Sequence, residues 1–171
     1  MSFLSNLRTK LFGEKTEVMK ILEHVPMFEG LSDLELKKIE IITHEREYMA
    51  GEVVFHEKEP GAGMYIIKRG TITLSKTSDG KKEVFLSELN DREFFGDLAL
   101  LDESPRSATA IAKVKTEVLG FYRPDFLNLL QREPKLGSKV LLKLAQLLAA
   151  RLRHTTTASV KGASNGPEAN A

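Results

Sequence analysis

The 171-residue chain contains no cysteine, so disulfide bonds and zinc–thiolate sites are excluded. No apolar run approaches the roughly 20 residues that a membrane-spanning helix needs. The first residues, MSFLSNLRTKLFGEK, lack the apolar core and the small-residue cleavage site of a signal peptide. The formal net charge of +1 gives no overall attraction to nucleic acids or to anionic membranes. We therefore expect a cytoplasmic protein with no membrane partner.

Catalytic signatures are also missing, because the sequence has no G-x-S-x-G elbow, Walker loop or H-E-x-x-H motif. The four histidines are far apart: His24, His44, His56 and His154. His56 with Glu57 and Glu59 is the nearest approach to the metal cluster of a cupin-type enzyme, but a solvated loop explains these residues better. We expect no enzyme activity, no catalytic residue, no catalytic cofactor and no metal.

The pattern of apolar residues divides the chain into three structured parts, between a segment 1–14 and a tail 158–171. Residues 15–47 are predicted to be a helical lead-in, with Ser32 and Glu35 forming a capping box. Residues 48–122 contain many short alternating strands separated by turns such as Asp79-Gly80, which is typical of a sandwich or jelly-roll barrel.

After Pro124 the apolar residues recur at the spacing of a helix instead of a strand. Residues 124–157 predict a hinge with a short helix ending near Pro134, followed by a long helix from Leu136 to Arg153 with a broad apolar face. The tail 158–171 is small, polar and contains glycine and proline, so it is predicted to be disordered.

The candidate ligand-binding residues lie mainly in the stretch FFGDLALLDESPRSATAIA, from Phe94 to Ala112. Arg106 supplies a permanent charge and a planar fork of donors, which suits a phosphate ester. Gly96 allows the backbone to approach a ligand closely, and Leu98 to Leu101 can form a one-turn helix whose first amides point at the phosphate. Ser107 adds a hydroxyl. The alternative is a set of ordinary turns and strand ends, with Arg106 in an internal salt bridge.

The stretch closely resembles the phosphate-binding cassette of cyclic nucleotide-binding domains, whose usual form is F-G-E-L-A-L-L, a short gap, and P-R-x-A, the last position being Ala108 here. The resemblance covers residues 15–157. It implies a mainly β fold with flanking helices: a β-jelly-roll barrel with N-terminal helices and a C-terminal hinge plus long helix. It also implies that Arg106 neutralises the phosphate, that the amides from Gly96 through Leu98 to Ala99 complete the cradle, and that Asp97 holds the ribose.

Asp97 departs from the family's usual glutamate and is one methylene shorter. A missed hydrogen bond to a charged group would weaken binding by roughly 1.5–3 kcal/mol. The departure therefore affects the expected affinity more than the expected fold.

Within the family, VFLSELNDREFFGDL and RLRHTT are similar to segments of the bacterial catabolite activators. This likeness implies that Leu74, Leu86 and Ser87 line the pocket near base and ribose. It also makes Thr155 and Thr156 contacts to the base, against the alternative of a frayed helix end with solvated hydroxyls.

No helix-turn-helix pattern follows the last helix, so direct DNA binding is not expected. The apolar face of that helix either belongs to the core alone or also forms a homodimer.

The resulting interpretation is a stand-alone cyclic nucleotide sensor that signals to an unidentified protein effector by moving its helices. cAMP is the first choice of ligand and cGMP the second, because a hydroxyl residue after the arginine also occurs in cGMP-binding members. The alternative is a degenerate module that acts as a protein-interaction domain without nucleotide.

Overall fold

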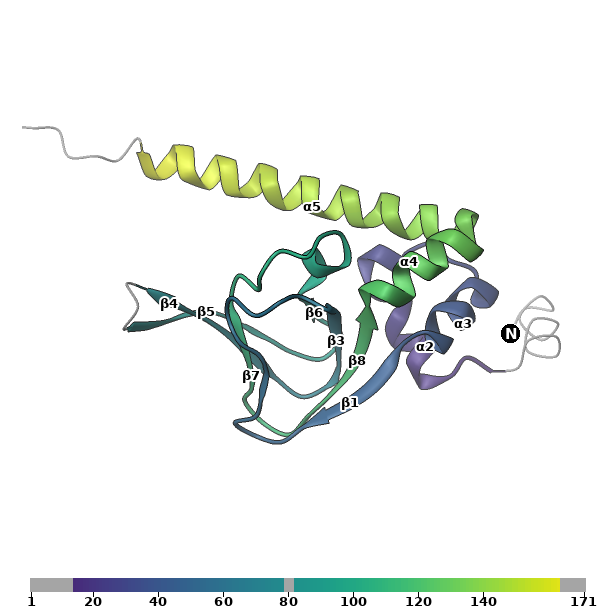
Figure 1. Cartoon of the computed structure of the whole chain (residues 1–171), viewed down its shortest axis with the longest axis horizontal. Helices are drawn as coiled ribbons and strands as arrows, with labels where there is room; N and C mark the ends of the chain where they lie inside the picture. The colour runs from purple at the N-terminus through teal and green to yellow at the C-terminus, as the bar shows by residue number, and fades with distance from the viewer. Residues whose placement is uncertain (1–13, 79–81, 164–171) are drawn as a thin grey trace, which may run out of the picture.

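Two antiparallel four-stranded sheets form the centre of the molecule (Figure 1). The computed structural model describes residues 14–78 and 82–163, and for 154–163 it describes the helical backbone alone. One sheet has the order β1 (His44–Tyr48), β8 (Thr116–Tyr122), β3 (Gly63–Arg69) and β6 (Phe94–Phe95). The other has the order β2 (Val53–Phe55), β7 (Thr109–Ala112), β4 (Ile72–Ser78) and β5 (Lys82–Leu89).

Helices flank the sheets at one end, and one long helix runs across them (Figure 1). The lead-in contains α2 (Glu17–Leu22), the 3-10 helix η1 (Pro26–Phe28) and α3 (Asp33–Ile41), and the C-terminal part contains α4 (Arg123–Arg132) and α5 (Pro134–Ala163). The mainly β jelly-roll prediction with flanking helices is confirmed. Within the described part of the chain, no helix combines the length and apolar character needed to cross a membrane.

Local signals explain where several helices begin. The predicted capping box of α3 is present: the Ser32 hydroxyl accepts from the amide of Glu35, and the Glu35 carboxylate accepts from the amide of Ser32. Pro124 lies in the first turn of α4 and Pro134 opens α5, where a missing N–H leaves no hydrogen bond unmade. A single residue, Glu133, therefore separates α4 from α5.

Two boundaries differ from the sequence predictions. Residues 44–47 were expected in the helical lead-in but belong to β1, which pairs with β8 from His44↔Gly120 to Tyr48↔Thr116. The β1 strand (HEREY) is mostly exposed and has no apolar alternation, so backbone pairing with β8 stabilises it without a sequence signal. The disorder predicted from residue 158 is also wrong as far as Ala163, because α5 continues to that residue. Residues 164–171 lie outside the described residues, as does the predicted turn at Asp79 and Gly80 between the paired strands β4 and β5.

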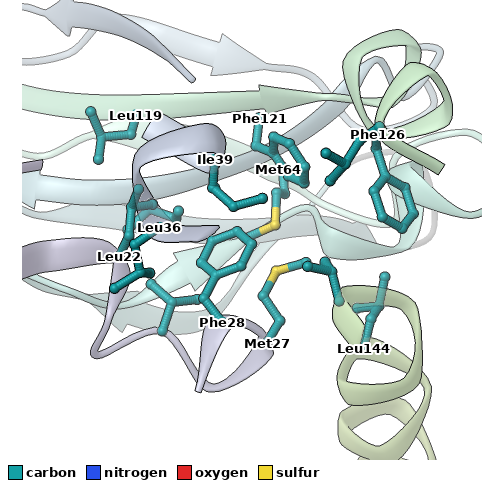
Figure 2. Packing of buried hydrophobic residues seen from close by; sticks show 14 of the residues in the cluster. Leu22, Met27, Phe28, Leu36, Ile39, Met64, Leu119, Phe121, Phe126 and Leu144 are labelled. Atoms are coloured by element: carbon teal, nitrogen blue, oxygen red, sulfur yellow. The ribbon is translucent and has the colours of Figure 1, made fainter. Parts of the chain in front are cut away.

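The larger core joins the lead-in, α4, α5 and the barrel (Figure 2). Phe121 of β8 packs edge-on against Phe28 of η1 and Phe126 of α4, each with ring centres 5.8 Å apart. Leu144 of α5 belongs to the same cluster. Because residues from η1, β8, α4 and α5 share this core, the position of α5 depends on both the lead-in and the barrel.

Ion pairs add to this connection between the lead-in and the C-terminal helices. Lys139 of α5 contacts Glu35 at 2.6 Å, and the pKa of Glu35 falls to about 2 because Lys139 and the Ser32 amide both bind its carboxylate. Lys143 of α5 contacts Glu29 at 2.8 Å. The first half of α5 is therefore attached to the lead-in, and its second half extends over the barrel (Figure 1).

Candidate functional site

The turn after β6 forms a backbone cradle. Gly96 has φ +75° and ψ 17°, a left-handed conformation that glycine adopts without steric cost. A Cβ atom there would lie 2.5 Å from Nη1 of Arg106, so a larger residue would displace the arginine. The 3-10 helix η2 (Asp97–Leu100) follows directly, and its first N–H groups have no acceptor within the helix. The predicted one-turn helix is confirmed and begins one residue before Leu98.

Arg106 is a buried cation fixed by carbonyl oxygens and an aromatic ring. Its Nη2 donates to the Gly63 carbonyl at 2.7 Å and its Nη1 to the Gly96 carbonyl at 3.2 Å. The guanidinium carbon lies 4.0 Å from the centre of the Phe55 ring, and the residue is 7% exposed. Burial lowers the pKa of the Arg106 guanidinium, which remains charged because an arginine starts so far above neutral pH.

The alternative with Arg106 in an internal salt bridge is wrong. Among residues 14–78 and 82–153, no carboxylate lies within salt-bridge distance of its guanidinium, and its Nε is buried without a hydrogen-bond partner. Two backbone carbonyls do not balance a full charge, and a buried cation without a counter-ion is costly. Arg106 is therefore a buried cation whose charge no carboxylate of those residues balances at close range.

Asp97 is a buried carboxylate that binds the long helix. It is 4% exposed, and its Oδ2 accepts from Nη1 of Arg151 at 2.5 Å. The guanidinium of Arg151 also lies 5.2 Å from the centre of the Phe94 ring. Residues 54 positions apart in sequence thus meet at the cassette, and the second half of α5 is attached to the site.

Sequence reasoning missed Arg151 as a site residue. A signal was present, because Val140, Leu144 and Arg151 recur at spacings of four and seven residues, which places them on one face of a helix. Since Val140 and Leu144 are fully buried, Arg151 faces the barrel.

A cavity of about 350 Å³ brings the cassette residues together. Its lining residues are Gly96, Asp97, Leu98, Ala99, Asp102, Ser104, Pro105, Arg106 and Ser107. The lining combines one buried cation, the start of η2, hydroxyl groups and a buried carboxylate. Such a set can bind a molecule that carries one negative charge beside hydroxyl groups. Ala108, also predicted as a site residue, follows directly and is buried.

Leu74, Leu86 and Ser87 are not among the lining residues of this cavity. Leu74 of β4 lies opposite Ser87 of β5, next to a bulge that displaces Leu86, and Leu86 is 49% exposed. Their contact with base and ribose stays a prediction. The side chains of Thr155 and Thr156 lie outside the described residues.

The candidate metal cluster at the β2–β3 loop has other hydrogen-bond partners. The Glu57 carboxylate accepts from the Thr77 amide at 2.8 Å, and the Glu59 carboxylate accepts from the His56 amide at 2.9 Å. In the part of the chain that the structure describes, no group of three or more histidine and acidic side chains could hold a metal ion. These residues shape the loop that pairs with Arg106, whose amide donates to the Glu59 carbonyl.

Solved structures support the fold. The crystal structure of the Thermus thermophilus catabolite activator protein matches with a TM-score of 0.73 and 35% sequence identity, covering 81% of this chain and 63% of that one. The likeness thus covers most of this chain.

Sequence relatives point in the same direction. The cyclic AMP receptor protein of Thermus thermophilus is 37% identical over 128 residues, which are 75% of this chain and 57% of that protein. A cAMP-dependent protein kinase regulatory subunit of Mycosarcoma maydis is 41% identical over 98 residues, which are 57% of this chain and 18% of that subunit. The chain thus spans less than two thirds of the length of either relative. The family model of the cyclic nucleotide-binding domain matches residues 45–133. With the cassette geometry described above, this match shows that the chain belongs to the cyclic nucleotide-binding domain family.

Proposed function

We propose that this chain is a sensor that binds cAMP, with cGMP as the second choice, and acts by binding rather than by catalysis. The observation that carries the proposal is Arg106, a buried guanidinium with an unpartnered Nε beside a cavity that also contains a buried carboxylate. A cyclic phosphodiester supplies the missing negative charge. Support for cAMP comes from the names of the two relatives, a cyclic AMP receptor protein and a cAMP-dependent kinase regulatory subunit.

Asp97 provides a physical link between ligand and helix. Arg151 contacts Oδ2 of this carboxylate, and Oδ1 can accept the ribose hydroxyl, because an ionised carboxylate accepts several hydrogen bonds. The Asp97 carboxylate would thus bind both the ribose and Arg151. Nucleotide binding and the position of α5 in which Arg151 contacts Asp97, here called the closed position, therefore favour each other. A ligand that prefers the closed state shifts the population of α5 positions.

The moved helix is the surface that a protein effector would recognise. Leu141, Leu142 and Leu152 of α5 are exposed, which also supports the proposed homodimer through this helix. The cytoplasmic location, the action without a DNA-binding module and the absence of enzyme activity stay predictions.

Replacing Arg151 with glutamine is expected to weaken nucleotide binding about tenfold, the size of a typical coupling between two sites. The physical reason is that the variant loses the charged contact that holds α5 at Asp97. Arg151→Lys should restore part of the affinity because it keeps the charge. Arg153→Gln, two residues further along the same exposed helix segment, is the matched control and should bind like the native protein. Tighter binding by Arg151→Gln would mean that Arg151 competes with the ribose instead of cooperating with it.

Isothermal titration with cAMP and, separately, with cGMP tests the proposed function. We expect saturable binding at micromolar concentration or tighter, because the cavity holds one cation for the single phosphate charge. We expect cAMP to be preferred on the ground of the two relatives named above. The protein must first be shown to be free of co-purified nucleotide. No heat and no thermal shift with either nucleotide would refute the sensor, and the chain would then be the interaction module that binds no nucleotide.

A further inference from the structure

The cassette cavity carries a second carboxylate, Asp102, which the proposed function does not use. Asp102 lines the cavity together with Arg106 and Ser107. Its side chain is exposed and lies in the loop between η2 and Arg106. Its Oδ1 accepts from the Ser104 amide at 3.2 Å, and its Oδ2 accepts from the Ser104 hydroxyl at 2.8 Å. Both donors are neutral, so these bonds orient the carboxylate without balancing its charge.

The two carboxylates of the cavity differ in how their charges are balanced. Asp97 contacts Arg151, as described above. Asp102, in contrast, has no lysine, arginine or histidine within salt-bridge distance among residues 14–78 and 82–153. Arg106 is the one cation among the described residues that line the cavity. An anionic ligand there would therefore be attracted by Arg106 and repelled by Asp102.

We infer that Asp102 is a specificity-determining residue that disfavours ligands with two negative charges relative to ligands with one. The inference rests on the proposed function, because it concerns the same cavity. A cyclic phosphodiester carries one negative charge, whereas the phosphomonoester formed by its hydrolysis carries close to two above neutral pH. Arg106 attracts the dianion more strongly than the monoanion, and Asp102 counteracts this extra attraction. The sensor would thereby discriminate against the open nucleotide that hydrolysis of its ligand produces.

The expected effect is moderate, because Asp102 is exposed and water and salt screen its charge. Removing one repelling charge at an exposed site should tighten the binding of a monoanion by about threefold. Coulomb energy is proportional to charge, so the same change should tighten the binding of a dianion by about ninefold. The ratio of the two affinities is therefore the informative quantity. A change in cavity shape would alter both affinities without this proportion.

The test compares adenosine 5′-monophosphate with its methyl phosphodiester, two open nucleotides that differ by one charge and one methyl group. Each is used to displace labelled cAMP from the full chain at about pH 8, where the monophosphate is a dianion. Asp102→Asn removes the charge and keeps an oxygen that can accept from the Ser104 amide. We expect this variant to raise the affinity for the monophosphate relative to the methyl ester by about threefold.

Two further variants separate the charge of Asp102 from other effects of the loop. Glu103→Gln is the matched control, because Glu103 is the neighbouring carboxylate, contacts Arg123 at 3.0 Å and does not line the cavity. It should leave the ratio unchanged. Asp102→Ser places a hydroxyl that can accept from the same turn and should change the ratio as the asparagine variant does. A folding defect in one Asp102 variant would therefore not decide the result.

The outcomes distinguish this inference from the proposed function. An unchanged ratio in the neutral Asp102 variants, in protein that still binds cAMP, would overturn the inference and leave the sensor intact. An equal change of the ratio in Glu103→Gln would also overturn it, since the loop's general field would then explain the effect. A native chain that binds neither cAMP nor cGMP would refute the proposed function, and the inference with it.

Discussion

Replacing Arg106 with glutamine should remove cyclic nucleotide binding, with a loss of about 3 kcal/mol or more, which is roughly a hundredfold or greater in affinity. Glutamine keeps a donor but loses the charge and the planar fork that binds a phosphate in two places. The loss is large because Arg106 has no acidic partner among the described residues, so its charge is available to the ligand. Titration with cAMP and cGMP measures the effect.

Folding must be checked separately, because Arg106 also supports the cradle. Its donors bind the carbonyls of Gly63 and Gly96, and an unsatisfied buried carbonyl costs about 1–3 kcal/mol. Arg106→Lys keeps the charge without the fork and should bind with intermediate affinity. Arg123→Gln is the matched control, because Arg123 is the other described arginine with an unpartnered Nε and does not line the cavity. A folded Arg106→Gln protein that binds nucleotide as tightly as the native chain would contradict the assignment of the cassette.

Replacing Gly63 with alanine is expected to cause one of the largest losses of stability that a single methyl group can cause in this chain, about 3 kcal/mol or more. The new Cβ would lie 2.4 Å from the carbonyl oxygen of Phe121 and 2.6 Å from Cα of Tyr122. Both are backbone atoms of β8, so no side-chain rotation relieves the contact and β3 must move away from β8. Since Gly63 pairs with Tyr122 and its carbonyl binds Arg106, nucleotide affinity should fall as well.

Urea denaturation of Gly63→Ala and Gly30→Ala separates crowding from backbone strain. Gly30 has φ +81° and open space around its Cβ position, so alanine there should cost only the left-handed strain, about 1–2 kcal/mol. Gly63 does not have a positive φ, so the cost of alanine at this position arises from steric crowding alone. Equal midpoints for the two variants would show that β3 and β8 adjust easily and would remove the steric argument.

The cassette could be predicted from the sequence because its parts lie close together along the chain. Gly96, Asp97 and the start of η2 are consecutive, and Arg106 follows ten residues after Gly96. Their conformations depend on local rules: a glycine in the left-handed region, a short helix and a rigid turn at Pro105. The same holds for the capping box at Ser32, which joins residues only three apart.

The predicted secondary-structure boundaries are wrong where no local sequence signal marks the element. Strand β1 has no apolar alternation, and its pairing partner β8 lies more than 60 residues later. The length of α5 was underestimated because the residues after Thr157 are small and polar, a composition that does not distinguish a helix from a disordered tail. In both cases the sequence contained no local signal that could decide between the alternatives.

The family resemblance, most of the order of helices and strands, and the candidate phosphate-binding arginine could be predicted from the sequence, because they depend on neighbouring residues and their spacing. Three features became visible only in the folded chain: Arg106 has no carboxylate partner among the described residues, Arg151 reaches Asp97 across 54 positions, and Gly63 has no room for a methyl group. The physical reason is that burial and charge pairing arise when distant segments pack together. A local pattern specifies which groups are present, but packing decides which groups they meet.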